Sequence, residues 1–146
     1  LLVIDVDRFK SVNDAYGHEV GDHVLCGVAA SIEQWDSPNS IGARIGGEEF
    51  AILMIGTSGM ELRRFAEQVR SSIREWGPVQ RLIGRPVTAS IGVADAHPAV
   101  DFDTLYPVAD QALYAAKHAG RDHVMFGPVQ AAHRADSAAD PYALTS

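Results

Sequence analysis

RIGGEEF (residues 44–50) is the segment that decides the fold, because it joins two strand patterns through a tight turn. Residues 41–45 and 50–55 are rich in apolar side chains and predict two strands, while the Gly46-Gly47 pair between them is typical of a hairpin turn. Glu48 and Glu49 follow this turn at the entrance of the second strand. The segment therefore predicts an antiparallel strand pair with two adjacent carboxylates at its tip.

Helix and strand patterns alternate on both sides of this hairpin. They predict further strands at residues 1–4, 85–95 and 123–126, and helices at 8–16, from 21–22 to about 32, from 58 to 77–78, and from about 104 to 118. Ser58 to Glu61 has the pattern of a capping box, and Pro107 falls in the predicted first turn of the last helix. These elements predict an α/β (α+β) sandwich in which helices flank a central, mostly antiparallel sheet.

The composition excludes several classes of protein. The chain has 146 residues, enough for one domain, and its formal charge of −7 argues against nucleic-acid binding through a basic surface. The single cysteine, Cys26, excludes an internal disulfide, fits a reducing compartment and is expected to be a small core residue. Since neither a membrane-spanning apolar run nor a signal peptide is present, we expect a cytoplasmic bacterial domain that makes no membrane contact itself. The alternative is that upstream sequence attaches it to a membrane protein.

The two ends of the sequence suggest a domain boundary and a truncation. The chain opens without methionine inside the strand pattern of residues 1–4, so we expect a fragment whose natural start lies upstream. After Gly127 the sequence is rich in Ala, Asp, Ser and Pro without periodicity, which predicts a mobile tail. We therefore expect one domain at residues 1–127 and a tail at 128–146.

Carboxylates provide the first candidate site. Asp5 ends the first strand and, if that strand lies beside the hairpin, it can converge with Glu48 or Glu49. Carboxylates in one place repel each other unless a divalent cation lies between them, and Mg²⁺ prefers such oxygen ligands. The alternative is that Asp5 and Asp7 cap the next helix and that the glutamates are solvated charges of the turn.

Cations and amide groups provide a second candidate site. Lys117 and Arg121, four residues apart at the end of the last helix, could bind phosphate oxygens with help from Lys10, or could only offset the helix dipole. Asn13 and Asp22 could recognise the hydrogen-bonding edge of guanine. The alternative is that Asn13 bonds its own helix end and that Asp22 caps the next helix.

Four motifs in one order give these candidates a common explanation. They are LVIDVDRFKSVNDAYGHEVGD (residues 2–22), RIGGEEF (44–50), ASIGVA (89–94) and ADQALYAAKHAGR (109–121). Together, over residues 1–126, they resemble the GGDEF domain of bacterial diguanylate cyclases, in its GGEEF form. The resemblance implies a fold similar to nucleotidyl cyclases and polymerase palms. It also implies condensation of two GTP molecules to cyclic di-GMP with release of pyrophosphate.

The resemblance also implies a role for each candidate. Asp5, Glu48 and the Val6 carbonyl would hold two Mg²⁺ ions per GTP, or Mn²⁺ in their place, and Glu48 and Glu49 are the catalytic candidates. The implied substrate-binding residues are Phe9, Lys10, Asn13, His18, Asp22, Lys117 and Arg121. The partners would be GTP, a second copy of the domain in a catalytic homodimer, and an upstream sensory domain. The alternative function is a catalytically idle GTP-binding module that regulates a partner.

The sequence departs from the family pattern in three respects. Ser37 and Ser40 stand where many members carry an Arg-x-x-Asp product-inhibition site, so we expect no feedback inhibition there. Asp122 replaces the usual Asn after Gly-Arg, which predicts a local structural change. The helix that normally precedes the first strand, with its motifs, is not in the sequence.

Overall fold

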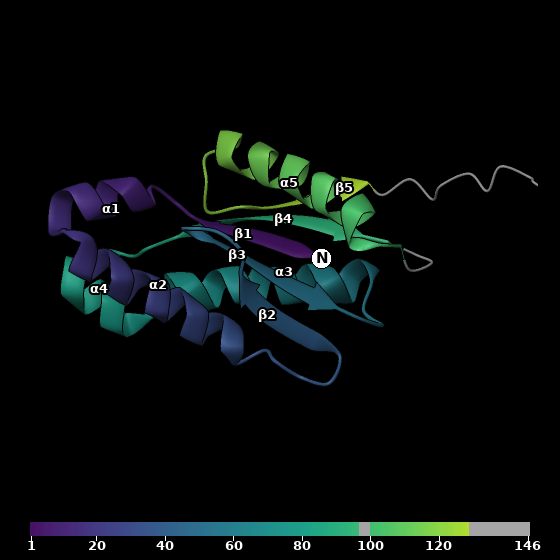
Figure 1. Cartoon of the computed structure of the whole chain (residues 1–146), viewed down its shortest axis with the longest axis horizontal. Helices are drawn as coiled ribbons and strands as arrows, with labels where there is room; N and C mark the ends of the chain where they lie inside the picture. Colours follow the sequence, from purple (N-terminus) through teal and green to yellow (C-terminus); the bar gives the residue numbers. More distant parts are fainter. Residues whose placement is uncertain (97–99, 129–146) are drawn as a thin grey trace, which may run out of the picture.

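The computed structural model describes residues 1–96 and 100–128, which form five strands and five helices (Figure 1). In chain order the elements are β1 (Leu2–Val6), α1 (Phe9–Tyr16), α2 (His18–Glu33), β2 (Ser40–Arg44), β3 (Glu49–Met54), α3 (Gly59–Arg74), α4 (Gly77–Ile83), β4 (Ala89–Asp95), α5 (Phe102–His118) and β5 (Val124–Pro128). The strand order in the sheet is β2-β3-β1-β4-β5. Only the β4–β5 pair is parallel, which confirms the predicted mostly antiparallel sheet.

Helices cover the two faces of the sheet unequally. Figure 1 shows α2, α3 and α4 on one side and α5 alone on the other, where it packs on β1, β4 and β5. Successive side chains of a strand point to opposite faces, so Leu2 and Ile4 of β1 enter the larger core and Val3 enters the smaller core under α5. The central strand is therefore apolar on both faces until it reaches Asp5.

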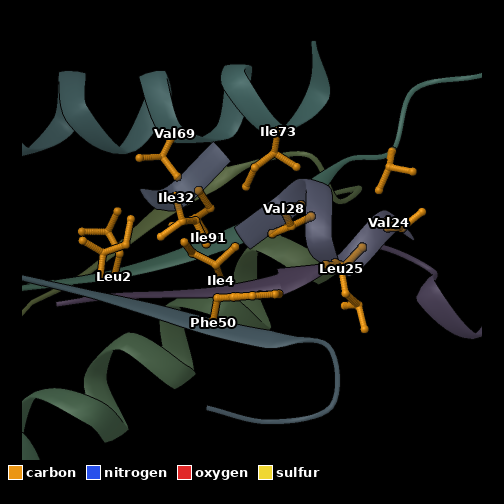
Figure 2. Close-up of a cluster of buried hydrophobic side chains, with 14 of the residues drawn as sticks. Leu2, Ile4, Val24, Leu25, Val28, Ile32, Phe50, Val69, Ile73 and Ile91 are labelled. Carbon is orange, nitrogen blue, oxygen red and sulfur yellow. The ribbon is translucent and has the colours of Figure 1, made fainter. Parts of the chain in front are cut away.

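The larger core fixes α2 and α3 against the sheet. Figure 2 shows Leu2, Ile4, Phe50 and Ile91 from the strands beneath helical residues that include Ile32 and Val69. Each of these side chains is at most 3% exposed. Fully burying one large apolar side chain contributes about 1.5–3 kcal/mol, so this layer holds β1 rigidly at the point where its polar end begins.

The smaller core explains the glycine of the ASIGVA motif. A Cβ atom at Gly92 would overlap the main chain of α5, at the Ala109 carbonyl oxygen and the Leu113 nitrogen. Only glycine allows α5 to approach β4 this closely. The close approach in turn brings the C-terminal end of α5 to the end of β1.

The structure corrects two predicted helix starts, those of α2 and α5, and one predicted helix cap, since α3 begins directly after Ser58 as expected. Helix α2 begins at His18, so Gly21 and Asp22 lie inside it. The capping box is absent, since the Ser58 side chain makes no cap and the Gly59 N–H donates instead to Asp95 Oδ2 at 2.8 Å. Helix α5 begins at Phe102, so Pro107 lies beyond its first turn.

Other predictions need smaller corrections. Helix α3 ends at Arg74, and the Gly77-Pro78 pair predicted to end it begins the short helix α4, which was not predicted. The strand predicted at 85–95 covers only 89–95. Cys26 is exposed rather than buried in the core. Strand β5 reaches Pro128, and residues 129–146 of the predicted tail lie outside the described residues.

Candidate active site

Two carboxylates converge at one end of the sheet, as the neighbouring positions of β1 and β3 require. The register places Glu49 opposite Asp5, and the Val6 N–H donates to the Glu48 carbonyl at 3.1 Å. Lys117, at the end of α5, binds Asp5 through its Nζ at 2.8 Å from Oδ2. In Figure 1 these segments meet at the left end of the sheet.

The surroundings of Asp5 and Glu48 disfavour the ionised form of both carboxylates. Burial raises the pKa of Asp5, although the Lys117 ammonium opposes this shift. Burial and then the charge of Asp5 raise the pKa of Glu48. Since each carboxylate is costly to ionise here, the pair calls for more positive charge than Lys117 alone provides.

The oxygen donors fit a hard divalent cation. Within residues 1–96 and 100–128, no group of three or more His, Cys, Asp or Glu side chains is placed to hold a metal. The oxygen donors available to a cation are therefore the Asp5 and Glu48 carboxylates and the main-chain carbonyl of Val6, the residue that follows Asp5. Such an incomplete set suits Mg²⁺, which keeps several positions for water and for substrate phosphate oxygens.

The hairpin gives its two glutamates different surroundings. Glu49 folds over Gly46, where a Cβ atom would lie 2.6 Å from Glu49 Oε2. After burial, the charge of Glu49 is the next cause that raises the pKa of Tyr106 on α5. Arg44, which sequence reasoning did not single out, donates to the Gly46 and Gly47 carbonyls at 3.1 and 2.6 Å and so fixes the turn. The charges of Asp5 and Lys117 thus act on Glu48, whereas the charge of Glu49 acts on Tyr106 of α5.

A cavity of about 470 Å³ opens beside Glu48 and gathers most of the predicted substrate-binding residues. Its volume is in the range of about 300–1,000 Å³ that is usual for small-molecule sites. The predicted residues that line it are Phe9, Lys10, Asn13, His18, Asp22 and Glu48. Leu25 and Arg44 also line the cavity. The sequence did not predict this, because Leu25 belongs to the apolar face of a helix and Arg44 to the hairpin.

Asn13 and Asp22 do not play the local roles offered as alternatives. The Asn13 Oδ1 atom is buried and, among the described residues, has no hydrogen-bond partner. It packs against Gly21, where a Cβ atom would overlap it. Asp22 lies beyond the first turn of α2 and is exposed, so it does not cap the helix. Both residues line the cavity, where Asp22 is exposed and the Asn13 Oδ1 atom is covered by α2.

The predicted cations are divided between two places. Lys117 binds Asp5, and Lys10 lines the 470 Å³ cavity. Arg121 follows α5 in the left-handed region at φ 66° and lines a different cavity, although its charge still reaches Asp5. The charges of both Lys117 and Arg121 therefore act on Asp5 at the end of β1.

Asp7 orients the chain around this site rather than capping a helix. Helix α1 begins after Arg8 without a side-chain cap. The Asp7 carboxylate accepts hydrogen bonds from Thr88 Oγ1 at 2.7 Å, from Ser90 Oγ at 2.6 Å and from the Asp122 N–H at 2.9 Å. Thr88 and Ser90 were not predicted as part of the site. The only sequence feature that could have indicated their role is the ASIGVA motif, which contains Ser90.

The side chains of Ser37 and Ser40 form a hydrogen bond with each other. Their hydroxyl oxygens are 2.8 Å apart, and the Ser40 hydroxyl also donates to the Trp35 carbonyl. These short side chains close the loop before β2 and present no guanidinium or carboxylate to a ligand. The absence of product inhibition at this loop stays a prediction.

Comparisons with known proteins agree with this geometry. The family model described as "Diguanylate cyclase, GGDEF domain" matches residues 1–123. Diguanylate cyclase DgcM of Escherichia coli (strain K12) is 40% identical over 126 residues, covering 86% of this chain and 30% of that protein. Diguanylate cyclase VdcA of Vibrio cholerae is 38% identical over 128 residues, covering 86% of this chain and 38% of that protein.

Solved structures with the same fold are also similar in sequence. The active GGEEF domain of a diguanylate cyclase from Vibrio cholerae has a TM-score of 0.74 at 33% identity, covering 89% of this chain and 82% of that one. The GGDEF domain of DgcB from Caulobacter crescentus, solved in complex with c-di-GMP, has a TM-score of 0.75 at 31% identity, covering 86% and 73%.

The family assignment follows from these matches. The chain spans about a third of the length of the curated relatives described above, so it corresponds to one domain of those proteins. The expected resemblance and the expected fold are both confirmed. The chain belongs to the GGDEF family of diguanylate cyclase domains.

Proposed function

We propose that this domain is a diguanylate cyclase, which condenses two GTP molecules into cyclic di-GMP and releases two pyrophosphates. One observation carries the proposal. Glu48, on which the charge of Asp5 acts, lines a cavity that also contains Asn13 and Asp22, so the proposed sites for phosphate chemistry and for guanine recognition lie next to each other. An idle GTP-binding module would have no need for two carboxylates that burial makes costly to ionise.

Within the proposal, the cavity binds guanosine. The Asn13 side-chain amide hydrogen-bonds the base, and the Asp22 carboxylate accepts from the N1–H and the 2-amino group of guanine. Phe9 and His18 pack around the base, and Lys10 binds the phosphates. A carboxylate at Asp22 disfavours adenine, which presents an unprotonated N1 at that edge.

The reaction forms one bond and breaks one bond at each α-phosphorus. The 3′-oxygen of one GTP bonds to the α-phosphorus of the other, and the bond from that phosphorus to the β-phosphate oxygen breaks. The same exchange on the second GTP closes the ring. Glu48 and Glu49 are the candidates to accept the 3′-hydroxyl proton. Lys117 and Arg121 stabilise the charge on the departing pyrophosphate.

Members of this family use a divalent metal, and we assign it to Asp5, Glu48 and the Val6 carbonyl. Mg²⁺, two ions per GTP, is the proposed species, with Mn²⁺ as a substitute. When bound there, the metal would neutralise phosphate charge and lower the pKa of the 3′-hydroxyl.

The assembly and its setting are part of the proposal. Each subunit binds one GTP, so two copies must face each other across a two-fold axis to join both halves of the product. We take residues 1–127 as the catalytic domain of a longer cytoplasmic protein with an upstream sensory domain. Its only cysteine, Cys26, is a free thiol, which fits a reducing compartment. In the described part of the chain, no helix has the length and apolar character to cross a membrane.

The proposal is tested by offering GTP and ATP together with Mg²⁺ and separating the products by chromatography. We expect cyclic di-GMP, two pyrophosphates for each cyclic dinucleotide, and no product that contains adenine. A protein that binds GTP and Mg²⁺ as a dimer but forms no cyclic dinucleotide would contradict the proposal.

A further inference from the structure

The loop that follows α5 is tied to a helix on the other face of the sheet. Asp122 lies in this loop, and each of its two carboxylate oxygens pairs with an arginine of α3. Arg70 Nη1 donates to Oδ1, and Arg74 Nη1 donates to Oδ2. Since α3 and α5 cover opposite faces of the sheet (Figure 1), these ion pairs connect the end of α5 with the opposite helix layer.

The two ion pairs differ in their exposure to water. The Arg70 and Asp122 side chains are each 19% exposed, whereas the Arg74 side chain is 51% exposed. Hydrogen bonds between charged groups are roughly twice as strong as neutral ones, and partly buried pairs are screened less by salt. The Arg70–Asp122 pair, whose members are 52 positions apart in the sequence, therefore contributes more to holding the loop than the Arg74 pair does.

The backbone of the loop has a conformation that needs such support. Arg121 and Asp122 have φ angles of 66° and 50°, a region that residues with side chains disfavour, so it persists only where the surroundings fix it. The Arg121 N–H donates to the Ala116 carbonyl at 3.2 Å, and the Asp122 N–H donates to Asp7 Oδ2 at 2.9 Å. The side chain of Asp122 attaches the same two residues to α3.

Arg121 depends on this loop for its position. Its charge acts on Asp5, and among the described residues it forms no ion pair. Asp122 is its direct neighbour in the sequence, and a carboxylate there could pair with the Arg121 guanidinium. Because both oxygens of Asp122 are bound by α3, this carboxylate does not compete with a substrate phosphate for Arg121.

We propose that Asp122, Arg70 and Arg74 are positioning residues for the cyclase reaction, which hold the loop in the conformation that Arg121 needs. The inference rests on the proposed function, in which Arg121 stabilises the charge on the departing pyrophosphate. The three residues act through Arg121 and not on the nucleotide itself. Such positioning matters because a displacement of about 1 Å, caused far from the reacting atoms, can slow a reaction about a hundredfold.

Steady-state kinetics of cyclic di-GMP formation by the full chain test the proposal. Asp122→Asn removes the charge that α3 binds and keeps a residue that tolerates positive φ. Arg70→Gln removes the opposite charge from the same ion pair. Glu67→Gln is the matched control, because it breaks the other ion pair of Arg70, at 2.9 Å, and leaves the loop untouched. Thermal unfolding of each variant verifies that it is folded.

We expect Asp122→Asn and Arg70→Gln each to lower kcat about tenfold, with the KM for GTP changed less than about threefold, as loss of alignment in the transition state does. The two variants change the net charge in opposite directions, so a fall in kcat for both excludes a simple effect of charge. Glu67→Gln should change kcat less than about twofold. An unchanged kcat in Arg70→Gln, or opposite effects of the two variants, would overturn the proposal.

A combination with Arg121→Gln shows whether Arg70 acts through Arg121. Residues that act as a unit have effects that do not add. In the Arg121→Gln background, Arg70→Gln should therefore lower kcat by less than about twofold. A further tenfold fall in that background would overturn the proposal, because it would show that Arg70 supports the site independently of Arg121.

Amide hydrogen exchange separates this proposal from the cyclase assignment. In Arg70→Gln the Arg121 and Asp122 N–H groups should exchange at least about fivefold faster than in the wild type, and in Glu67→Gln at the wild-type rate. Faster exchange in a protein that forms no cyclic dinucleotide would support the hold of α3 on the loop and refute the cyclase assignment. Unchanged exchange in an active enzyme would overturn the positioning role and leave the cyclase assignment intact.

Discussion

Replacing Asp7 with alanine tests how the site is held together. The Asp7 side chain is only 7% exposed and joins three segments, because its carboxylate accepts from Thr88, from Ser90 and from the Asp122 N–H. Ser90 is fully buried, so its hydroxyl cannot turn to water when the carboxylate is removed. Asp7→Ala therefore leaves buried donors without partners at the loop that carries Arg121.

The size of the effect follows from these contacts. A hydrogen bond to a charged group contributes about 1.5–3 kcal/mol, and the cost of burying the carboxylate offsets part of the sum. We expect Asp7→Ala to lower the free energy of unfolding by about 3–5 kcal/mol. In a domain of this size, that corresponds to a fall in Tm of about 10–20 °C. Asp7→Asn keeps one acceptor oxygen and should cost only about 1–2 kcal/mol.

Urea unfolding followed by circular dichroism measures these differences, with Asp110→Ala as the control. Asp110 is also an aspartate, but it is exposed on α5 and makes none of these bonds. Asp110→Ala should change stability by less than about 0.5 kcal/mol. If Asp7→Ala were as stable as this control, Asp7 would not hold the loop, and the account of how Arg121 is positioned would be wrong.

Other consequences concern pH, packing and regulation. Because the pKa values of Asp5 and Glu48 are raised, the folded metal-free protein keeps protons that the unfolded chain loses, so its stability should fall as pH rises through these raised values. Calorimetry in chelator should show this fall, and Glu48→Gln should remove part of it. For the same reason, Mg²⁺ binding should weaken on acidification before ordinary carboxylates protonate. Gly92→Ala should destabilise the fold by about 3 kcal/mol or prevent folding, since the added Cβ overlaps α5; an unchanged unfolding curve would refute the packing described for α5. Added cyclic di-GMP should not inhibit through Ser37 and Ser40, so inhibition that is lost on Ser37→Ala would contradict the reading of that loop.

Much of the fold was predictable because its patterns are local. Two apolar runs around Gly46-Gly47 specify the hairpin, and the apolar face of the last helix specifies α5. The start of α2 was misplaced because Gly21 looked like a helix boundary. It is a packing position instead, where Asn13 occupies the space of a side chain. Such a reason depends on a residue in another helix and is not visible in the local pattern.

The sequence predicted which residues form the site better than it predicted the contacts that they make. Asp5 and Glu48 could be expected to meet once β1 and the hairpin were neighbours. The hydrogen bonds of Asp7 with Thr88 and Ser90 join residues more than 80 positions apart, so the sequence near Asp7 does not predict them. Lys117 was expected to bind phosphate, and its ion pair with Asp5 was not predicted because the two residues are far apart in the sequence.

The carboxylate pair of Asp5 and Glu48 is the central claim, and the ratio of turnover to binding in Glu48→Gln tests it most directly. Glutamine keeps the size of the side chain and removes its charge. Production of cyclic di-GMP from GTP and Mg²⁺ and the Kd for GTP in metal-free buffer are measured on the same preparations. We expect turnover to fall at least about a hundredfold, as loss of a key electrostatic group does, with GTP affinity changed less than about threefold. Turnover close to that of the wild type would contradict the claim that this pair carries the reaction.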